Sequence, residues 1–450
     1  MNLVIVGAGM VGATLVENFI KEGHNVSVID CNVSAVEKII NKYDVLGFVG
    51  SGIERDVLIQ AGTETADCFI ACTSRDELNV VCCVLAKKLG AKSIVARIRN
   101  PEYFKEMEAL TEELGIDMIL NPEYRTAIEI SRMLKFPSAK SVESFSSGKT
   151  IMVEFDVPTG NPMIDRTVVH ITKDCQNKVL FGMIERDGKT YVPKGDFIIK
   201  ANDKIFIIGT EVGITSFCKK LKIFKPSAKS VFVIGGGNVC YYLASKLCES
   251  NVNVKIVEKD AERCTELAND LKGVSVLHGD GTDQEMLNEE SLQRSDACVT
   301  LTGNDEENVV VSLYARQKKL DKVITKVTRP SMYELAKTLD LDGIVFPKSV
   351  IVNDIVRFVR SRQVAFGSKI NKYYRLSNNV EALEFTLTEN FEGKNVPIKN
   401  LKIKRGVIIG AIVRDGEFVL PTGDTQLVIN DNVLIVTTIP GITDISEILH

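Results

Sequence analysis

Short apolar runs alternate with amphipathic segments through residues 1–135 of the chain. In order, the apolar runs are LVIVG, NVSVID, VLGFVG, CFIACT, SIVARI and DMIL. Each run has the length of a buried strand, and the stretches between them carry apolar residues at helical spacing. Strands that alternate with helices in this way predict βαβ units joined in one parallel sheet.

The pattern changes in the segment that follows, where alternating and β-branched runs such as TIMVEFDVP and KIFIIGT predominate. An Asp-Gly pair, Asp187–Gly188, lies between two such runs, and a second pair occurs at Asp415–Gly416. Asp-Gly between strand-like runs is typical of a tight hairpin turn. We therefore predict a small α+β domain after each parallel sheet, reached through linkers near residues 136–148 and 360–380 that contain Pro, Ser, Gly or Asn.

The second half of the chain repeats the first. Gly7 and Gly235 lie 228 positions apart, and the same offset separates Asp30 from Glu258. At this offset ERDGKTYVPKGDFIIKANDKIFIIGT aligns with VRDGEFVLPTGDTQLVINDNVLIVTT. A register kept over such distances indicates an internal duplication. The predicted fold class is α/β, with two Rossmann-like doubly wound parallel sheets, each followed by a small α+β domain. The expected domains are 1–135, 140–224, 229–360 and 370–450.

Composition narrows the classes of protein that fit. The chain has 450 residues, of which 45% are hydrophobic and 25% charged, and its net charge is −4. That charge gives no support for a nucleic acid or an anionic membrane as partner. None of the apolar runs is long enough for a transmembrane helix, and the start lacks the charged region of a signal peptide. We expect a cytosolic protein.

The eleven cysteines show no metal-binding or disulfide pattern. They include no CxxC pair and no Cys/His array, and the chain has only four histidines. Most of the cysteines lie in apolar stretches, which is typical of buried free thiols in a cytosolic protein. No metal site is predicted.

The first glycine-rich turn has the spacing Gly7-x-Gly9-x-x-Gly12, directly after a strand and at the start of a helix. Such glycines permit a tight turn, close approach of a pyrophosphate and close packing of helix on strand. The next strand ends in Asp30, whose carboxylate can accept hydrogen bonds from ribose hydroxyls and would repel a 2′-phosphate. We predict an NAD(H) site; the alternative is a Rossmann-like domain that binds nothing. The predicted turn comprises Gly7, Ala8, Gly9, Met10, Val11 and Gly12.

The second turn is less regular. It retains Gly235 and Gly237, followed by Asn238, but Cys240 stands at the third glycine position. Glu258 still suits ribose, and Asp280 stands where the first half has Ser51. Two interpretations remain open: a site of different nucleotide preference or affinity, and a degenerate structural site. Whether ATP or ADP competes with NAD(H) for the same pocket also stays open.

Other polar residues follow the remaining strands, where a doubly wound sheet binds its ligands. In the first half they are Cys72, Thr73, Ser74, Asp76 and Asn79, then Arg97 and Arg99. In the second half they are Thr302, Asn304, Asp305 and Asn308, then Lys326 and Arg329. The arginines can bind phosphates bidentately, or they are a solvated surface pair. The aspartates at helix starts can also serve only as caps.

No catalytic constellation is apparent, so no catalytic residue is predicted. His170 is isolated, and the matching stretch of the second half has no histidine. A dehydrogenase usually needs a proton donor or acceptor beside the cofactor. A nucleotide bound as an effector needs none, so a ligand-gated regulator fits better. The alternatives are an NAD-dependent oxidoreductase with a duplicated fold and a soluble NAD sensor with another protein partner.

The chain resembles the peripheral subunits of Trk-type potassium uptake systems, which are built from tandem RCK (KTN) domains. The stretches that carry this resemblance are VIVGAGMVGATLVENFIKEGHNVSVID, TSRDELNVVCCVLAKKLGAKSIVARIRNPEY, LNPE and LKFPSAKSVESF, together with the repeated second half. The similarity spans nearly the whole chain, and ARIRNPEY and LKFPSAKSVESF are more specific than the glycine turn.

The resemblance implies a homotetrameric ring beneath a membrane potassium channel subunit, with nucleotides changing the ring's shape. It implies that Gly7, Gly9, Gly12 and Asp30 bind NAD, that Thr73 and Ser74 contact the cofactor, and that Arg97 and Arg99 meet nucleotide phosphates. The apolar helices expected at YRTAIEISRMLKF and SVIVNDIVRFVRSRQV are candidates either for a crossover onto a neighbouring subunit or for closing their own domains. Cys240 and Ser51 depart from the family pattern and put the second site and the adenine contacts in doubt.

Overall fold

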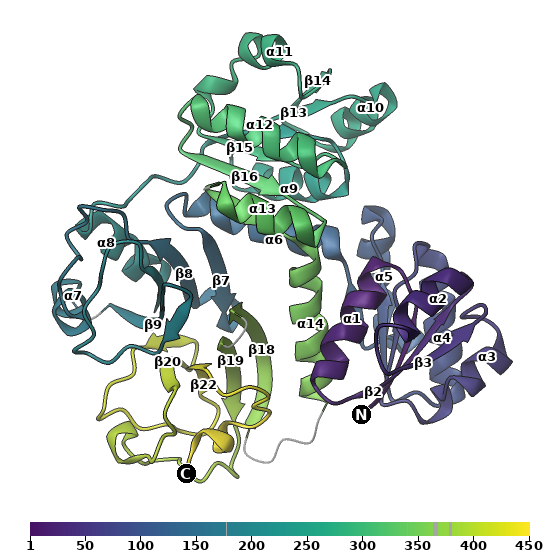
Figure 1. Cartoon of the computed structure of the whole chain (residues 1–450), viewed down its shortest axis with the longest axis horizontal. Coiled ribbons are helices and arrows are strands. Elements are labelled where there is room, and N and C mark those ends of the chain that lie inside the picture. Colours follow the sequence, from purple (N-terminus) through teal and green to yellow (C-terminus); the bar gives the residue numbers. More distant parts are fainter. Residues whose placement is uncertain (177, 340, 363–367, 378–379) are drawn as a thin grey trace. The chain divides into compact units, whose positions relative to one another are not determined.

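A computed structural model describes the chain except for residues 177, 340, 363–367 and 378–379 (Figure 1). The chain divides into two compact units. The first comprises residues 1–128 with 237–243 and 346–356. The second comprises residues 129–236, 244–345 and 357–450. In the described part, no helix is both long and apolar enough to cross a membrane.

The first unit contains a six-stranded parallel sheet in the order β3-β2-β1-β4-β5-β6. The strands are β1 (Asn2–Val6), β2 (Asn25–Asp30), β3 (Leu46–Val49), β4 (Cys68–Ala71), β5 (Ser93–Arg97) and β6 (Met118–Leu120). The order reverses between β1 and β4, which is where sheets of this kind bind ligands. The six predicted strands of the first half are thus confirmed.

The helices of this half follow the strands and pack on them. They are α1 (Met10–Lys21), α2 (Val33–Ile40), α3 (Arg55–Gln60), α4 (Asp76–Leu89), α5 (Pro101–Leu114) and α6 (Pro122–Lys135), with a short 3₁₀ turn at Thr63–Thr65. Helix α4 packs on β4 and β5, and α2 on β2 and β3. The fully buried strand β4 fixes the centre of the sheet, because all four of its residues lack solvent contact.

The second unit begins with a five-stranded antiparallel sheet in the order β10-β9-β11-β8-β7. Its elements are β7 (Ser141–Phe145), a 3₁₀ turn (Ser146–Gly148), β8 (Thr150–Asp156), α7 (Val168–Asp174), β9 (Val179–Arg186), β10 (Lys189–Tyr191), β11 (Lys204–Gly209) and α8 (Glu211–Lys220). The predicted hairpin turn joins β9 to β10, with φ of 49° at Asp187 and 72° at Gly188. Positive φ at both turn residues is the conformation that Asp-Gly adopts readily.

A second six-stranded parallel sheet repeats the first, in the order β14-β13-β12-β15-β16-β17. Its strands are β12 (Ser230–Ile234), β13 (Asn253–Glu258), β14 (Val274–His278), β15 (Ala297–Thr300), β16 (Lys322–Lys326) and β17 (Gly343–Val345). Its helices are α9 (Asn238–Glu249), α10 (Ala261–Asp270), α11 (Gln284–Glu289), α12 (Asp305–Gln317), α13 (Pro330–Thr338) and α14 (Pro347–Ser361), with a 3₁₀ turn at Leu292–Arg294. Even the register is repeated, since Asn2 pairs with Asn25 and Ser230 with Asn253.

The last sheet has the order β18-β19-β22-β20-β21, which is the topology of the first antiparallel sheet. Its strands are β18 (Ser368–Ser377), β19 (Val380–Leu387), β20 (Val407–Arg414), β21 (Glu417–Val419) and β22 (Asn432–Thr437). The duplication and the predicted fold class are therefore confirmed. The copies differ at two helices: short 3₁₀ turns at Ile398–Asn400 and Ile445–Ile448 stand in the second where the first has α7 and α8.

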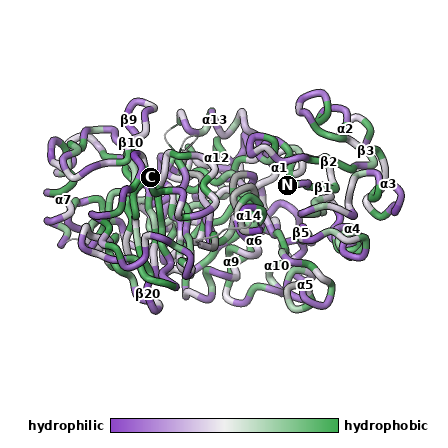
Figure 2. Tube along the Cα trace, turned by 90° about the horizontal axis from the view of Figure 1, so that it is seen from below, coloured by the Kyte–Doolittle hydropathy of each residue, from purple (hydrophilic) through white to green (hydrophobic). Residues whose placement is uncertain are grey.

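The two antiparallel sheets share one apolar cluster, formed by Phe145, Met152, Met183, Phe206 and Ile208 from the first and Val380, Ala382, Ala411, Leu434 and Val436 from the second. In Figure 2 such strands, β20 among them, appear as green runs interrupted by purple turns. Gly182 and Gly410 allow the close approach: an added Cβ at either would lie 2.6–2.7 Å from Ile208 Cδ1. The C-terminal parts of the two halves are thus packed on each other within one chain.

The predicted linkers need correction. The segment near 136–148 contains the strand β7, whose residues pair with β8 through Ser141–Phe145. Strand β18 occupies part of the segment near 360–380, of which residues 363–367 and 378–379 lie outside the described residues. The Pro, Ser and Asn residues in these stretches do not mark linkers, because edge strands also tolerate polar residues. The two predicted apolar helices are confirmed as α6 and α14; residues 363 and 364 at the end of the second prediction are not described.

Candidate functional site

The first glycine turn is tightly built between β1 and α1. Gly7 has φ of +111°, and an added Cβ there would lie 3.0 Å from the Cys72 carbonyl. A Cβ at Gly12 would lie 1.8 Å from the Gly7 oxygen, so only glycine fits. Gly9, by contrast, has nothing within 4 Å of an added Cβ. The turn therefore leaves open space at the one glycine whose role would be to admit a pyrophosphate.

Asp30 closes this turn from the end of β2. Its Oδ2 accepts a hydrogen bond from the Ala8 N–H at 2.7 Å, and its Oδ1 accepts one from the Asn32 N–H at 2.8 Å. The side chain is only partly buried. A carboxylate has about four acceptor positions, so the two amides leave positions for ribose hydroxyls. The structure brings together the turn and the acid that the sequence paired.

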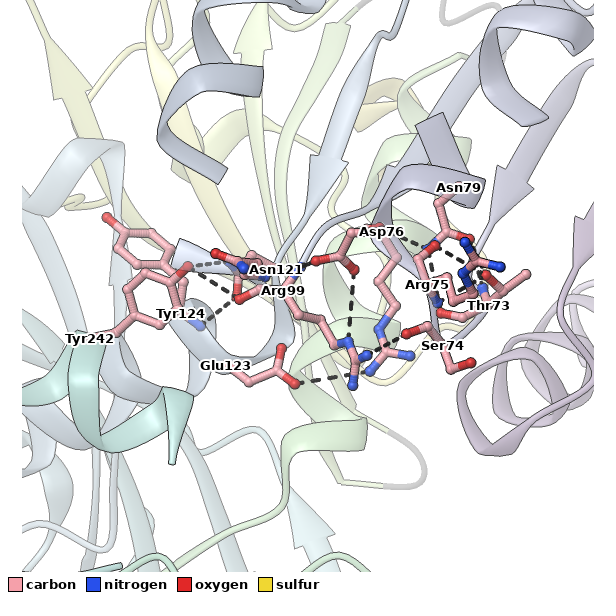
Figure 3. Close-up of polar contacts among 12 residues, drawn as sticks. Thr73, Ser74, Arg75, Asp76, Asn79, Arg99, Asn121, Glu123, Tyr124 and Tyr242 are labelled. Carbon is pink, nitrogen blue, oxygen red and sulfur yellow. Dashed lines mark hydrogen bonds and ion pairs between the residues drawn. The ribbon is translucent and has the colours of Figure 1, made fainter. Parts of the chain in front are cut away.

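The loop after β4 is fixed by the buried Asn79 of α4. Its Oδ1 accepts hydrogen bonds from the Thr73 N–H at 2.9 Å and from the Thr73 hydroxyl at 2.7 Å. Its Nδ2 donates to the Arg97 carbonyl at 2.9 Å, which joins the ends of β4 and β5. Asn79 thus links Thr73 to the strand end of Arg97, and Ser74 stands beside Arg99 at the carboxyl edge of the sheet (Figure 3).

Asp76 holds the backbone that carries the arginines. Its Oδ2 accepts hydrogen bonds from the N–H groups of Arg99 and Asn100, both at 2.8 Å. The Arg99 guanidinium donates to the Ser74 carbonyl at 2.5 Å and lies 3.8 Å from Asp76 Oδ1 (Figure 3). Asp76 is therefore a positioning residue for the end of β5 and does more than begin α4.

Arg97 points into a partly closed environment beside Glu123. The guanidinium and the carboxylate are 4.0 Å apart, and their side chains are 15% and 21% exposed. Burial lowers the pKa of Arg97 and raises the pKa of Glu123, and their mutual attraction opposes both shifts. In the described part of the chain, Arg97 Nε and Glu123 Oε2 are buried without a hydrogen-bond partner. The solvated-surface interpretation of Arg97 is therefore wrong, and it has unused donor capacity for an anion.

An aromatic cluster that sequence reasoning missed borders this edge. Tyr242 of α9 lies 5.4 Å from Tyr124 and 6.2 Å from Phe104, centroid to centroid, in edge-on geometry. Its hydroxyl lies 2.9 Å from Asn121 Nδ2, which donates to it, and 3.4 Å from the Arg99 carbonyl. No local pattern marks Tyr242, because it comes from the other half of the chain.

The second glycine turn keeps the same design with different side chains. Gly235 has φ of +100°, and an added Cβ would lie 2.8 Å from the Thr302 nitrogen. Gly237 has nothing within 4 Å of an added Cβ, like Gly9. Asn238 opens α9, and Cys240 is fully buried at the third glycine position. The backbone geometry of the turn thus survives the loss of the third glycine.

Glu258 holds this turn as Asp30 holds the first. Its Oε2 accepts from the Gly236 N–H at 2.5 Å, and its Oε1 accepts from the N–H groups of Lys259 and Asp260. Arg263 is a difference that the sequence comparison overlooked: its Nε donates to the Gly236 carbonyl at 2.8 Å, where the first half has Ala35. The second turn therefore carries an added cation.

Asp280 is exposed and engaged locally. Its Oδ1 accepts from the Thr282 hydroxyl and N–H, and its Oδ2 lies 3.2 Å from Lys259 Nζ. These hydrogen bonds, that of the Thr282 hydroxyl first, lower the pKa of Asp280 to about 2. Asp280 is thus a fixed negative charge just after β14. Lys259, the residue that follows Glu258, links it to the end of β13.

The other predicted residues of the second half repeat the first half's network. Asn308 accepts from the Thr302 N–H at 2.9 Å and donates to the Lys326 carbonyl at 3.1 Å. Asp305 accepts from the N–H groups of Thr328 and Arg329, as Asp76 does in the first half. Asn304 caps α12. The Arg329 side chain forms ion pairs with Asp305 and Glu306.

The residues at the carboxyl edges of the two parallel sheets are suited to binding a ligand. Burial raises the pKa of the Cys72 thiol, which lies behind the first turn, to about 12, so it stays protonated and is a poor nucleophile. Among the described residues, no three His, Cys, Asp or Glu side chains are grouped so as to hold a metal ion. His170 bonds its neighbour Thr167 at 2.8 Å in the first antiparallel domain. Glycine turns, ribose-type acids and strand-end arginines are what a dinucleotide needs, so the residues of the first half fit NAD(H).

The fold and the paired turns define a tandem protein with two Rossmann-like, NAD-binding-type domains, each followed by an antiparallel domain. The TrkA-N domain family matches residues 3–122 and 231–347, and the TrkA-C domain family matches residues 152–222 and 383–450. The chain belongs to the family of Trk system potassium uptake proteins TrkA.

Relatives match along the full length. The Trk system potassium uptake protein TrkA homolog of Archaeoglobus fulgidus is 32% identical over 452 residues, covering 100% of both chains. The Trk system potassium uptake protein TrkA of Vibrio alginolyticus is 30% identical, covering 96% of this chain and 94% of its own.

Solved structures share the fold at lower identity. The GsuK channel bound to NAD has a TM-score of 0.63 at 18% identity, covering 97% of this chain and 76% of that chain. The GsuK RCK domain has a TM-score of 0.62 at 18% identity, covering 97% and 92%. These structures confirm the fold, and the family matches confirm the predicted family and its tandem order of domains.

Proposed function

We propose that this protein is a cytosolic regulatory subunit that senses nucleotides and gates a Trk-type potassium channel subunit in the membrane. The observation that carries the proposal is the hydrogen bond from the Ala8 N–H to Asp30, which joins an open glycine turn to a ribose-type acid. The family membership supplies the transport system, since the relatives are potassium uptake proteins. The domain boundaries 1–135, 140–224, 229–360 and 370–450 belong to this proposal.

The nucleotide we assign to the first turn is NAD(H). Gly7, Gly9 and Gly12 would let its pyrophosphate approach the backbone, and Asp30 would accept hydrogen bonds from its ribose. Arg97 would pair with its phosphate charge, and Thr73 and Ser74 would line the edge of the site. ATP or ADP are the further candidates, and solved structures of GsuK are bound to NAD and to ADP. NAD would act here as an effector, because none of the described residues around the turn is placed as a proton donor or acceptor for hydride chemistry.

Gating follows from the thermodynamic linkage between nucleotide binding and the shape of the protein. A nucleotide shifts an equilibrium between two shapes only by its differential affinity for them, and a tenfold difference is about 1.4 kcal/mol per site. In a homotetrameric ring, the assembly we propose, each chain would contribute two glycine turns, so small differences multiply. The duplication then lets one polypeptide supply two segments of the ring with turns of different chemistry.

Calorimetric titration with NADH, NAD⁺, ATP and ADP, run beside an absorbance assay for NADH consumption, tests the sensing part. We expect binding with no turnover. Steady consumption of NADH would instead support an oxidoreductase. Potassium flux through vesicles that contain the channel subunit, with and without this protein, tests the gating part. Flux that is unaffected by protein and nucleotide would overturn the proposal.

A further inference from the structure

We propose that Tyr242, from the second half of the chain, is a positioning residue for the first nucleotide site, which is incomplete without it. The inference rests on the proposed function for its ligand. Residues 237–243, at the start of α9, belong to the same compact unit as residues 1–128. The second half therefore supplies side chains to the carboxyl edge of the first parallel sheet.

Side chains hold the end of β5 at three points, in addition to the backbone hydrogen bond from the Ile98 N–H to the Leu120 carbonyl at 3.0 Å. Asn79 donates to the Arg97 carbonyl, and Asp76 accepts from the N–H groups of Arg99 and Asn100. Both of these come from α4 of the same half. The third point is the Tyr242 hydroxyl, which donates to the Arg99 carbonyl at 3.4 Å (Figure 3). The hydroxyl thus adds a contact from the second half of the chain to those that the first half makes with this segment.

The same hydroxyl also holds the next strand end. It accepts from Asn121 Nδ2 at 2.9 Å, while Asn121 Oδ1 accepts from the Tyr124 N–H at the start of α6. Asn121 is 2% exposed, so this contact is shielded from competing water. The hydroxyl therefore ties the end of β5, which carries Arg97, to the end of β6, after which α6 carries Glu123.

The phenol is suited to this role. Burial raises the pKa of Tyr242 well above its usual value, so the hydroxyl remains a donor. Edge-on contacts with Tyr124 and Phe104 fix the ring. The matching position of α1 does not repeat the arrangement, because it holds Thr14, which donates to the Met10 carbonyl of its own helix. A Tyr→Phe substitution removes the hydroxyl and keeps the ring, so the contributions of the two can be measured separately.

The test compares Tyr242→Phe with Tyr241→Phe, a matched control on the next position of α9. Both keep their rings, and Tyr241 contacts Tyr242 only through ring edges at 5.7 Å. Hydrogen exchange of the ligand-free protein should rise over residues 97–104 in Tyr242→Phe alone. NADH affinity at the first site should fall about fivefold in that variant, the effect of one neutral hydrogen bond, and the melting temperature should fall slightly because Asn121 loses its buried partner.

Each result decides one question. If wild type binds no NADH, the proposed function fails, and exchange over 97–104 still tests the positioning role. If wild type binds NADH but Tyr242→Phe changes neither exchange nor affinity, the inference is overturned and the proposed function stands. Equal effects of both substitutions also overturn it, because they would assign the effect to ring packing.

Discussion

The Asp30 carboxylate accepts a hydrogen bond from the Ala8 N–H at 2.7 Å, and so ties the end of the second strand to the glycine turn after the first. Glu258 makes the same contact with the Gly236 N–H. A carboxylate at this place has two roles. It orders the turn before a ligand binds, and its remaining acceptor positions can bind hydroxyls of that ligand. The two halves keep this relationship although the acid differs in length.

Asp30→Asn should weaken NADH binding at the first turn by about tenfold to a hundredfold, because the amide loses the charge and turns one acceptor into a donor. Calorimetry measures the effect. Asp44→Asn, at an exposed position beyond α2, serves as the control and should leave affinity unchanged. Equal affinity of Asp30→Asn and wild type would contradict the assignment of Asp30 to the ribose.

Two glycine substitutions should separate folding from binding. Gly12→Ala places a Cβ 1.8 Å from the Gly7 oxygen and should lower the stability of the first domain by more than about 2 kcal/mol. Gly9→Ala meets no atom within 4 Å, so it should melt like wild type and yet bind NADH more weakly. Thermal melts and calorimetry on both proteins check this. A stable Gly12→Ala protein would show that the turn can relax.

The buried Asp203 should be a main support of the first antiparallel domain. It is fully buried and accepts from Arg186 Nε at 2.6 Å and Nη2 at 2.7 Å. Asp203→Ala should cost about 3 kcal/mol in unfolding free energy. Asp431→Ala should cost a similar amount in the second copy, where Arg414 makes the same paired contact at 2.8 Å. Denaturant unfolding measures both, and a loss below about 1 kcal/mol in either would refute the shared role.

Lys322 should make stability depend on pH. It is 1% exposed, and its ammonium donates to the carbonyls of Ala139 and Asp342. Burial lowers the pKa of Lys322 to about 7. Between that pH and the ordinary lysine value the unfolded chain binds a proton that the folded protein lacks, so stability rises with pH, by up to about 1.4 kcal/mol per pH unit.

Melting curves at pH 6.5 and 8.5 test this on wild type, Lys322→Met and the exposed-lysine control Lys92→Met. The stability of wild type relative to Lys322→Met should increase at the higher pH. Only wild type has a buried ammonium at this position, and its desolvation penalty disappears when it loses its proton. Lys92→Met should track wild type at both values. Parallel curves for wild type and Lys322→Met would refute the prediction.

The sequence by itself determined the elements and their repetition. Alternating apolar runs predicted the parallel strands, Asp187–Gly188 predicted the hairpin, and the constant offset between Gly7 and Gly235 predicted the duplication. Each of these depends on residues close together in the chain, or on a pattern that a second copy repeats. Local conformational preference and periodic burial suffice to express them.

Only the tertiary structure decided which side chains meet at the first site. It placed Tyr242 against Asn121, buried Arg97 beside Glu123, and put Arg263 over the second turn. It also turned the supposed linkers into edge strands. These outcomes rest on contacts between residues far apart in sequence, whose free energy comes from burial and from hydrogen bonds that exist only once the elements have packed. No local pattern carries that information.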